Sequence, residues 1–145
     1  MAGRPPGRIG DPMNPIVHPE VAATKHFLWK EFLRGHKLPE GLIPEARVTL
    51  RKLQAARDLV DRPLVITSGY RPPDHPREAL KTKPGYHTRA MAVDVRVMDG
   101  HEAGTLVKAA LQVGLWGIGI RRKTGERGIV HLDSRICIAP VMWSY

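Results

Sequence analysis

Cysteine is almost absent from this chain, and so are apolar runs long enough to cross a membrane. Cys137 is the only cysteine among 145 residues, which excludes an intrachain disulfide and a zinc module built from four cysteines. Its neighbours Ile136, Ile138 and Ala139 are apolar, so we expect Cys137 to be a small buried side chain. Because no stretch approaches the roughly 18 apolar residues of a membrane helix, we expect no membrane insertion.

The N-terminus lacks the apolar segment of a signal peptide. We therefore expect synthesis in the cytoplasm, and release by a separate partner if the protein acts outside the cell. Residues 1–15 contain four of the 13 prolines and three glycines, a composition typical of a flexible arm without regular structure. Residues 16–145 have the length of a single domain, and we expect a monomer.

Acidic residues are outnumbered by basic ones. Lys and Arg total 23 against 14 Asp and Glu, a formal charge of +9, which attracts polyanions such as nucleic acid, acidic membranes or anionic cell-wall polymers. The basic residues are scattered, with Arg121–Lys123 the longest run, so we interpret them as a solvated surface. They accompany no nucleic-acid-binding motif and no interleaved aromatic residues, so we expect no specific nucleic-acid partner.

Two long helices are predicted by periodicity and by capping residues. Apolar side chains recur every three or four positions between Pro44 and Asp61, the pattern of an amphipathic helix. Asp99 and Glu102 have the spacing of a capping box that begins another helix, and Gly114 is placed to end it.

Four segments have the composition or alternation of β-strands, namely about 64–68, 92–97, 117–120 and 129–134. A short helix within 26–33, a long loop over 71–85 and a basic hairpin loop over 121–128 complete the order. This order predicts an α+β domain with a small, largely antiparallel sheet flanked by helices.

Two histidines and a carboxylate form a candidate metal site. His87 and Asp94 lie in GYHTRAMAVDVRV, and His131 lies in GIVHLDSR. If their strands are neighbours, the three side chains can hold a catalytic Zn²⁺ and leave a fourth position for water. Spacing alone leaves a plain structural reading open, because this is not a compact ligand motif. His75 and His101 are rival ligands, which we expect to be exposed.

The residues around this set resemble those of the zinc D-alanyl-D-alanine carboxypeptidase family. The family pattern runs Ser-Gly-Tyr-Arg, then Ser-x-His-x-x-Gly-x-Ala-x-Asp, then a late His, and this chain resembles the subgroup that ends in His-x-Asp. The family also contains phage L-alanyl-D-glutamate endolysins and shares its fold with the hedgehog signalling domain. The resemblance covers roughly residues 25 to 135. The chain departs from the pattern at Gly85, where the family has Ser, and at Ala90, where it has Gly.

The resemblance implies roles for the residues that match its motifs. His87, Asp94 and His131 match the zinc ligands. Arg71 matches the arginine that binds a substrate oxygen and stabilises the oxyanion, as a guanidinium of fixed charge is suited to do. Ser68 and Tyr70, in the same motif, are implied to be substrate-binding.

The general base is left open between two carboxylates. Many family members place a Glu three residues before the last His ligand, or a His two before it, and here those positions are Gly128 and Ile129. Asp133 faces the same side of its strand as His131, and we favour it as the base or as a residue that orients the ligand. Glu126 could reach in from the hairpin loop.

These features predict a zinc peptidase that hydrolyses an amide bond in peptidoglycan stem peptides, as a carboxypeptidase or as an endolysin-like endopeptidase. The cell-wall target and a phage or prophage origin come from the resemblance, and the expected release partner is then of the holin type. The alternative is a non-catalytic zinc-containing module that binds the cell wall or belongs to a phage structure. The missing Glu favours that alternative.

Overall fold

Two long helices form where the apolar stripe and the capping residues predict them. In the computed structural model, which describes residues 17–123 and 126–145, these are α2 (Ile43–Val60) and α4 (Gly100–Val113). The Asp99 carboxylate accepts a hydrogen bond from the Glu102 amide at 2.8 Å, and Gly114 ends α4 in the left-handed conformation. Both predicted ends of this helix are confirmed.

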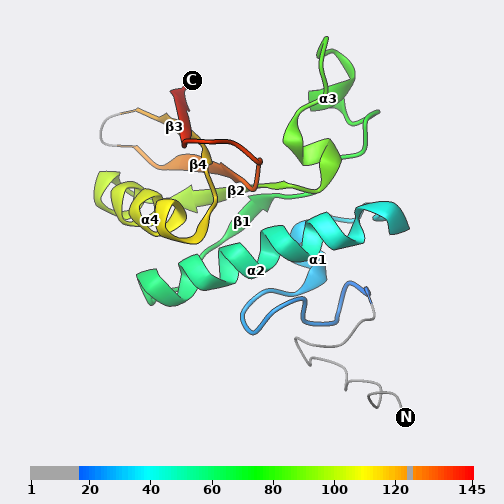
Figure 1. Cartoon of the computed structure of the whole chain (residues 1–145), viewed down its shortest axis with the longest axis horizontal. Coiled ribbons are helices and arrows are strands. Elements are labelled where there is room, and N and C mark those ends of the chain that lie inside the picture. The colour runs from blue at the N-terminus through cyan, green and yellow to red at the C-terminus, as the bar shows by residue number, and fades with distance from the viewer. Residues whose placement is uncertain (1–16, 124–125) are drawn as a thin grey trace.

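The remaining elements are short (Figure 1). In chain order they are α1 (Trp29–Leu33), the 3-10 helix η1 (Glu40–Leu42), β1 (Ile66–Ser68), α3 (Pro76–Ala79), the 3-10 helix η2 (Tyr86–Arg89), β2 (Ala92–Val97), β3 (Gly117–Arg122), β4 (Gly128–Asp133) and β5 (Val141–Ser144). The four predicted strands are present with small shifts at their ends. The predicted loop over 71–85 contains α3, because Pro76 suits the first position of a helical turn.

The strands form one sheet in the order β1-β2-β4-β3-β5. All neighbours pair antiparallel except β3 and β5, which run parallel. An α+β fold with a largely antiparallel sheet flanked by helices is therefore confirmed. Sequence reasoning missed β5, because its side chains are exposed or half-buried and show no alternation. Pairing with β3, a distant segment, places it in the sheet.

Alternation along the strands gives the sheet a covered face and an open face. Val93, Val95 and Val97 of β2 are at most 1 % exposed and belong to the core that includes side chains of α2 and α4. Asp94 and Arg96 lie between them and point the other way. The helices therefore cover the apolar face and leave a polar one accessible.

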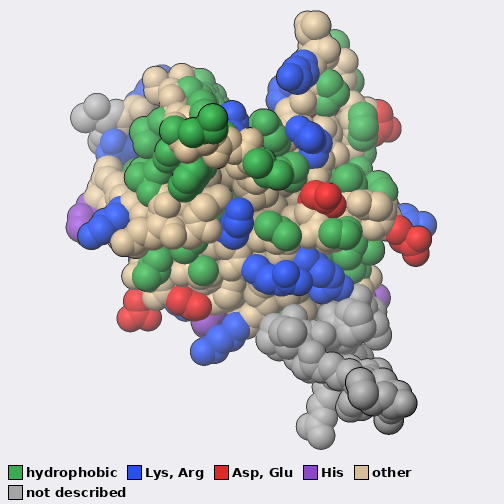
Figure 2. Space-filling model, in the orientation of Figure 1, with side chains coloured by type: hydrophobic (Ala, Val, Ile, Leu, Met, Phe, Trp, Pro, Cys, Tyr) green, Lys and Arg blue, Asp and Glu red, His purple; other side chains and the backbone are tan. Residues whose placement is uncertain are grey.

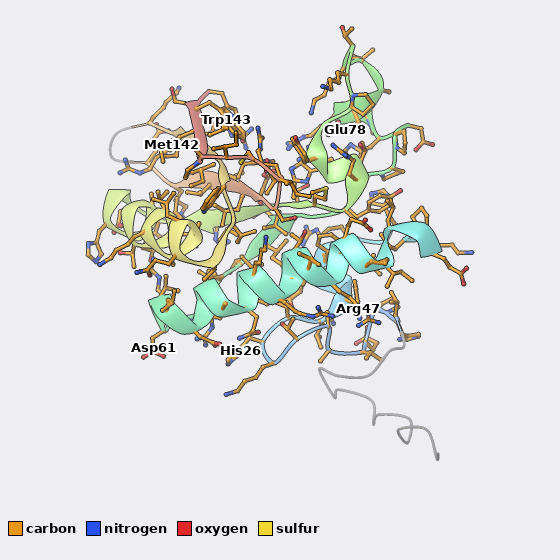
Figure 3. All side chains as sticks on the ribbon, in the orientation of Figure 1. His26, Arg47, Asp61, Glu78, Met142 and Trp143 are labelled. Atoms are coloured by element: carbon orange, nitrogen blue, oxygen red, sulfur yellow. The ribbon has the colours of Figure 1, made fainter. Side chains whose placement is uncertain are left out.

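A hollow opens on the accessible face. In Figure 1 the segment that contains α3 and the C-terminal strand β5 both rise above the face of the sheet that lies away from α2, with a space between them, and Figure 2 shows the notch that separates them. Figure 3 marks the two sides by Glu78 and Trp143. The long connection between β1 and β2 thus forms one wall, as loops that carry function often do.

The prediction of a buried segment around Cys137 is wrong. Ile136 and Ile138 are 98 % and 101 % exposed, and Cys137 is half-buried. The chain leaves the sheet after β4 and returns as β5, so these apolar residues never reach the core. The predicted arm over residues 1–15 lies outside the described residues. Within the described part, no helix is long and apolar enough to cross a membrane.

Candidate metal centre

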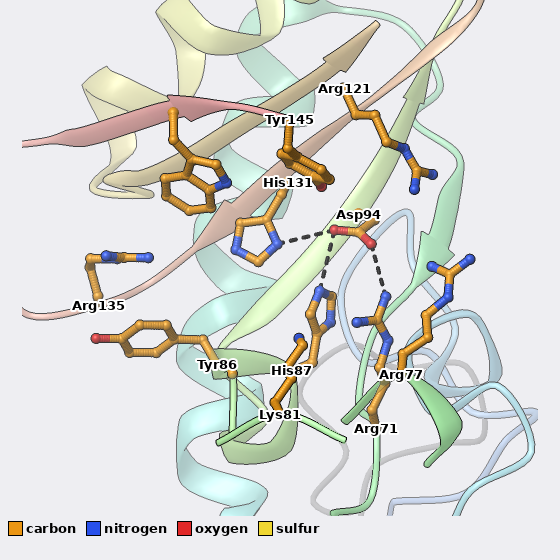
Figure 4. Close-up of a pocket in the computed structure, with 12 residues that line it drawn as sticks. Arg71, Arg77, Lys81, Tyr86, His87, Asp94, Arg121, His131, Arg135 and Tyr145 are labelled. Carbon is orange, nitrogen blue, oxygen red and sulfur yellow. Dashed lines mark hydrogen bonds and ion pairs between the residues drawn. The ribbon is translucent and has the colours of Figure 1, made fainter. Parts of the chain in front are cut away.

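His87, Asp94 and His131 converge on one point at the base of the hollow (Figure 4). They come from η2, β2 and β4, and one ligand atom of each lies within 4.8 Å of the others. Asp94 and His131 are direct cross-strand partners, which places both side chains on the open face. The pairing of β2 with β4 therefore brings together two ligands that are far apart in the chain.

A backbone carbonyl orients His87. Its Nδ1 lies 2.6 Å from the Gly69 carbonyl oxygen, and its Nε2 lies 3.3 Å from Asp94 Oδ1. A side chain at Gly69 would overlap the Phe32 backbone, while the following amide, Tyr70, donates to the Phe32 carbonyl oxygen at 2.9 Å. The glycine after β1 thus lets the chain pass close to α1 and present its carbonyl group to the ligand.

A second carboxylate orients His131. The His131 Nδ1 lies 3.1 Å from Asp94 Oδ1, and Nε2 lies 2.8 Å from Asp133 Oδ2. Asp133 is fully buried, and Arg135 donates from Nε and Nη2 to its two oxygens at 2.8 Å each. The Asp133 carboxylate lies over Gly117, where a side chain would overlap it. Nδ1 is therefore the nitrogen that His131 presents to Asp94.

The charges at the centre are coupled. Burial alone would raise the pKa of Asp94, but the hydrogen bonds from His131 and His87 outweigh it and hold that pKa well below its usual range. Burial likewise opposes ionisation of Asp133, but Arg135 and His131 lower its pKa to about 2. Burial would lower the pKa of His131, and the bonds to Asp133 and Asp94 reverse this and raise it. The centre thus favours a positive charge between two carboxylates.

These residues fit a zinc ion. Two imidazole nitrogens and a carboxylate oxygen are the ligand types of catalytic zinc sites. The other nitrogen of each imidazole is held, by the Gly69 carbonyl group and by Asp133, and such contacts orient a metal-binding histidine. Asp94 Oδ1 faces both of the nitrogens that remain. A metal ion bound here would replace the proton that protonated His131 carries on the nitrogen facing Asp94.

Arg71 is held beside Asp94 by three contacts. Its Nη2 donates to Asp94 Oδ2 at 3.1 Å, its Nη1 to Glu78 Oε1 at 3.1 Å, and its Nε to Ser68 Oγ at 2.9 Å. Arg71 and Glu78 are both buried. Sequence reasoning missed Glu78, which carries no signal beyond being an acidic residue in a loop of prolines and charges. Ser68 contacts Arg71 and does not line the pocket around the metal centre.

That pocket has a volume of about 530 Å³ and two unlike walls. On one side the Arg135 guanidinium lies 4.5 Å from the Tyr86 ring centre and 5.1 Å from that of Trp143. The Trp143 ring also lies 5.2 Å from the His131 ring. The other side is basic and includes Arg77 and Arg121. In Figure 4 both arginines lie on the Arg71 side of Asp94.

The structure does not bring every predicted residue to this pocket. Tyr70 is 3 % exposed and does not line this pocket, although it lines, with Ser68, a hollow that adjoins the pocket at Arg71. Glu126 is exposed and lines a neighbouring hollow instead. His101 is exposed and His75 half-buried, and neither joins the metal cluster. Among the described residues, Asp94 is the only one with an acidic side chain that lines the pocket.

The two departures from the family pattern lie beside the metal ligands, in η2 and its flanks. Ala90 follows η2 with a φ of 56°, in the left-handed region that favours glycine. The alanine therefore adopts a conformation that costs about 1–2 kcal/mol. The Gly85 amide donates to Glu78 Oε2 at 3.1 Å, and its carbonyl oxygen accepts from Thr88 Oγ1 at 2.7 Å. Neither change removes a metal ligand.

Comparison with known proteins agrees with this geometry. A model of the peptidase M15 family matches residues 25–133, which is most of the chain. The matched range contains the three candidate ligands and the residues that hold them, Gly69, Arg71 and Asp133. A search among curated proteins finds no match.

Proposed function

The chain belongs to the peptidase M15 family, and we propose that it is a zinc peptidase that hydrolyses an amide bond in peptidoglycan stem peptides. The observation that carries the proposal is the convergence of His87, Asp94 and His131 with their free ligand atoms turned inward. Membership of the family makes the chain a metallopeptidase. The wall peptide as its substrate rests on the resemblance of its motifs to those of wall peptidases.

The protein's part in the reaction is to hold the metal and to orient the substrate. When bound, zinc supplies a Lewis acid that polarises a carbonyl group and lowers the pKa of water. Three of the five N–H groups of Arg71 are used by Ser68, Glu78 and Asp94, which leaves two for a substrate oxygen. Because Arg71 is fixed before substrate arrives, it can stabilise developing negative charge without reorganisation.

We assign Asp133 to positioning and not to proton transfer. Both of its oxygens accept hydrogen bonds, from His131 and Arg135, and its side chain is inaccessible. It does not line the pocket where substrate would bind. Glu126 lies outside the same pocket. We therefore expect Glu126→Gln to retain wild-type turnover of a wall peptide.

Between the two modes of cleavage, an endolysin-like endopeptidase is the better supported. The pocket shares Arg71 and Arg77 with one adjoining hollow, and Arg121 and Tyr145 with another. A chain of residues can therefore continue past the metal centre on either side. A carboxypeptidase would need this space closed beyond the terminal residue. Release by a holin-type partner and a monomeric state remain predictions.

A non-catalytic zinc module is the second candidate, because no carboxylate other than Asp94 lines the pocket in the described part of the chain. Elemental analysis of the purified protein, followed by mass spectrometry of peptidoglycan incubated with it, separates the two. We expect about one zinc per chain, release of multi-residue fragments, and loss of cleavage after chelation or in His131→Ala. Release of single alanine residues would instead indicate a carboxypeptidase.

The outcomes are distinct. Stoichiometric zinc with no cleavage of any wall type supports the non-catalytic module. Absence of zinc from the wild type after reconstitution rules out both zinc functions. Asp58→Asn, a change on the exposed side of α2, is the control variant and should bind zinc and cleave as the wild type does.

A further inference from the structure

A second hollow of about 420 Å³ adjoins the metal pocket at the turn between β3 and β4. We call it the hairpin groove and define it by the side chains that carry the argument, Arg96, Arg121, Lys123, Glu126, Arg127 and Tyr145. Arg121 and Tyr145 also line the metal pocket. The two hollows therefore adjoin at Arg121 and Tyr145, whose guanidinium and ring centre lie 5.8 Å apart. A ligand that reaches past these two exposed side chains from the metal centre enters the groove.

Strand register fixes the spacing between the groove and the metal centre. Asp94 and His131 are cross-strand partners, and two residues further along, Arg96 lies opposite Ile129, which lies opposite Arg121. Residues two apart on a strand share a face, so both arginines lie on the open face with the metal ligands. Two residues of a strand span about 7 Å. Extended peptide covers the same distance in two residues.

The basic side chains of the groove have no acidic partner among the described residues. At the metal centre, Arg71 and Lys81 pair with Glu78, and Arg135 pairs with Asp133. In the described part of the chain, by contrast, no carboxylate oxygen lies within 4.0 Å of a charged nitrogen of the groove residues Arg96, Arg121, Lys123 and Arg127. Among the residues that the structure describes, Glu126 is the only acidic one that lines the groove. Like charges gathered in a hollow repel one another and attract anions.

We propose that the hairpin groove binds a carboxylate of the substrate, on a side chain two residues from the amide bond that is cleaved. Guanidinium groups recognise carboxylates with fixed donor geometry, and the row of Arg96 and Arg121 lies at the distance of two extended residues from the ligands. The groove thus makes the enzyme selective for acidic peptides. That the groove is a substrate subsite rests on the proposed peptidase function.

The test compares synthetic peptides that carry Glu or Gln at one, two, three or four residues from the cleaved bond, on either side. Cleavage by the zinc enzyme gives kcat/KM, and calorimetric titration of full-length His131→Ala gives Kd without cleavage. We expect Glu two residues away to bind about fivefold more tightly than Gln. The difference shrinks at high salt, because the groove residues are exposed.

A charge reversal provides the decisive variant. We expect Arg96→Glu to remove the preference for Glu and to favour a peptide with Lys at the same position. Lys108→Glu makes the same change on the exposed side of α4 and should leave the preference as it is. A preference for Lys created by Arg96→Glu cannot arise from a folding defect.

Equal Kd values for Glu and Gln at every position would overturn the proposal, and so would a preference that survives Arg96→Glu. Tighter, Arg96-dependent binding of a short single-stranded DNA would assign the groove to nucleic acid and overturn it as well. Selective binding without cleavage of any peptide would refute the peptidase function and leave the groove as a carboxylate site. Cleavage of the peptides with no preference between Glu and Gln would support the peptidase function and overturn the groove as a carboxylate site.

Discussion

Replacing Asp133 by Asn tests whether this carboxylate orients His131. In the structure, Asp133 acts only as an acceptor, for His131 Nε2 and for the guanidinium and backbone N–H groups of Arg135. An Asn side chain has one acceptor oxygen and one donor NH₂ group. One of the two partners must then face a donor, and the negative charge that favours Nδ1 as the free nitrogen of His131 is lost.

The expected effect is a zinc affinity ten- to a hundredfold weaker, about 1.4 to 2.7 kcal/mol, as is usual when the partner of a metal-binding histidine is removed. Asp133 also raises the pKa of His131, so protons compete with zinc more strongly in the wild type than in the variant. The loss of affinity should therefore be largest at neutral and higher pH, and should narrow as the pH falls.

Competition with a chromophoric zinc chelator across this pH range measures the affinity, and cleavage of a wall peptide at saturating zinc measures turnover. Asp58→Asn makes the same chemical change on the exposed side of α2 and should alter neither quantity. Unchanged zinc affinity with turnover lost would refute the positioning role and make Asp133 a proton carrier. No change in either quantity would show that His131 needs no partner.

Two further variants probe the surroundings of the site. Glu78→Gln should lower the free energy of unfolding by about 2 kcal/mol at neutral pH, because a buried acceptor for Arg71 and Lys81 loses its charge. Since the fold lowers the pKa of Glu78 against the effect of burial, this stability is present above the unfolded pKa of about 4.3. It is lost as the pH falls through the pKa of the folded state. Denaturant unfolding should show that the difference in free energy of unfolding between the wild type and Glu78→Gln becomes smaller from neutral to acid pH. A difference that does not depend on pH would show that the charge of Glu78 is not its cause. Gly119→Ala places a methyl group 2.6 Å from the Trp143 ring, which should displace that ring, change tryptophan fluorescence and destabilise by about 1–3 kcal/mol. Gly104→Ala, where a Cβ meets nothing within 4 Å, should be neutral or stabilising, and equal effects of the two would argue against the steric reason.

Most secondary structure could be predicted because its signals are local. The capping residue Asp99 and the alternation in Ala92–Val97 are signals within a few residues, and the helix and the strand that they predict are confirmed. The predicted capping box is only half formed, because the Glu102 carboxylate accepts from the Met98 amide and not from that of Asp99. β5 could not be predicted in the same way, since its place in the sheet depends on β3. Ile136 and Ile138 show the converse error, because apolar composition does not reveal whether a segment reaches the core.

Some residues of the candidate site could likewise be predicted from local motifs, and others could not. His87, Asp94, His131 and Arg71 could be selected from motifs alone. The choice between Asp133 and Glu126 could not, because it depends on which carboxylate lies within hydrogen-bonding distance of His131. Glu78 was missed for the same reason: only the folded connection between β1 and β2 places it against Arg71.

The sequence by itself determined the ligand types, the two long helices and the strands β1 to β4, because side-chain chemistry and periodicity are properties of short segments. Only the tertiary structure decided which nitrogen of each histidine faces Asp94, since that depends on partners supplied by other segments, Gly69 and Asp133. The tertiary structure also determined where the excess positive charge lies. Arginines that are scattered in the chain, such as Arg77, Arg96 and Arg121, gather along one open face, because strand pairing sets their neighbours.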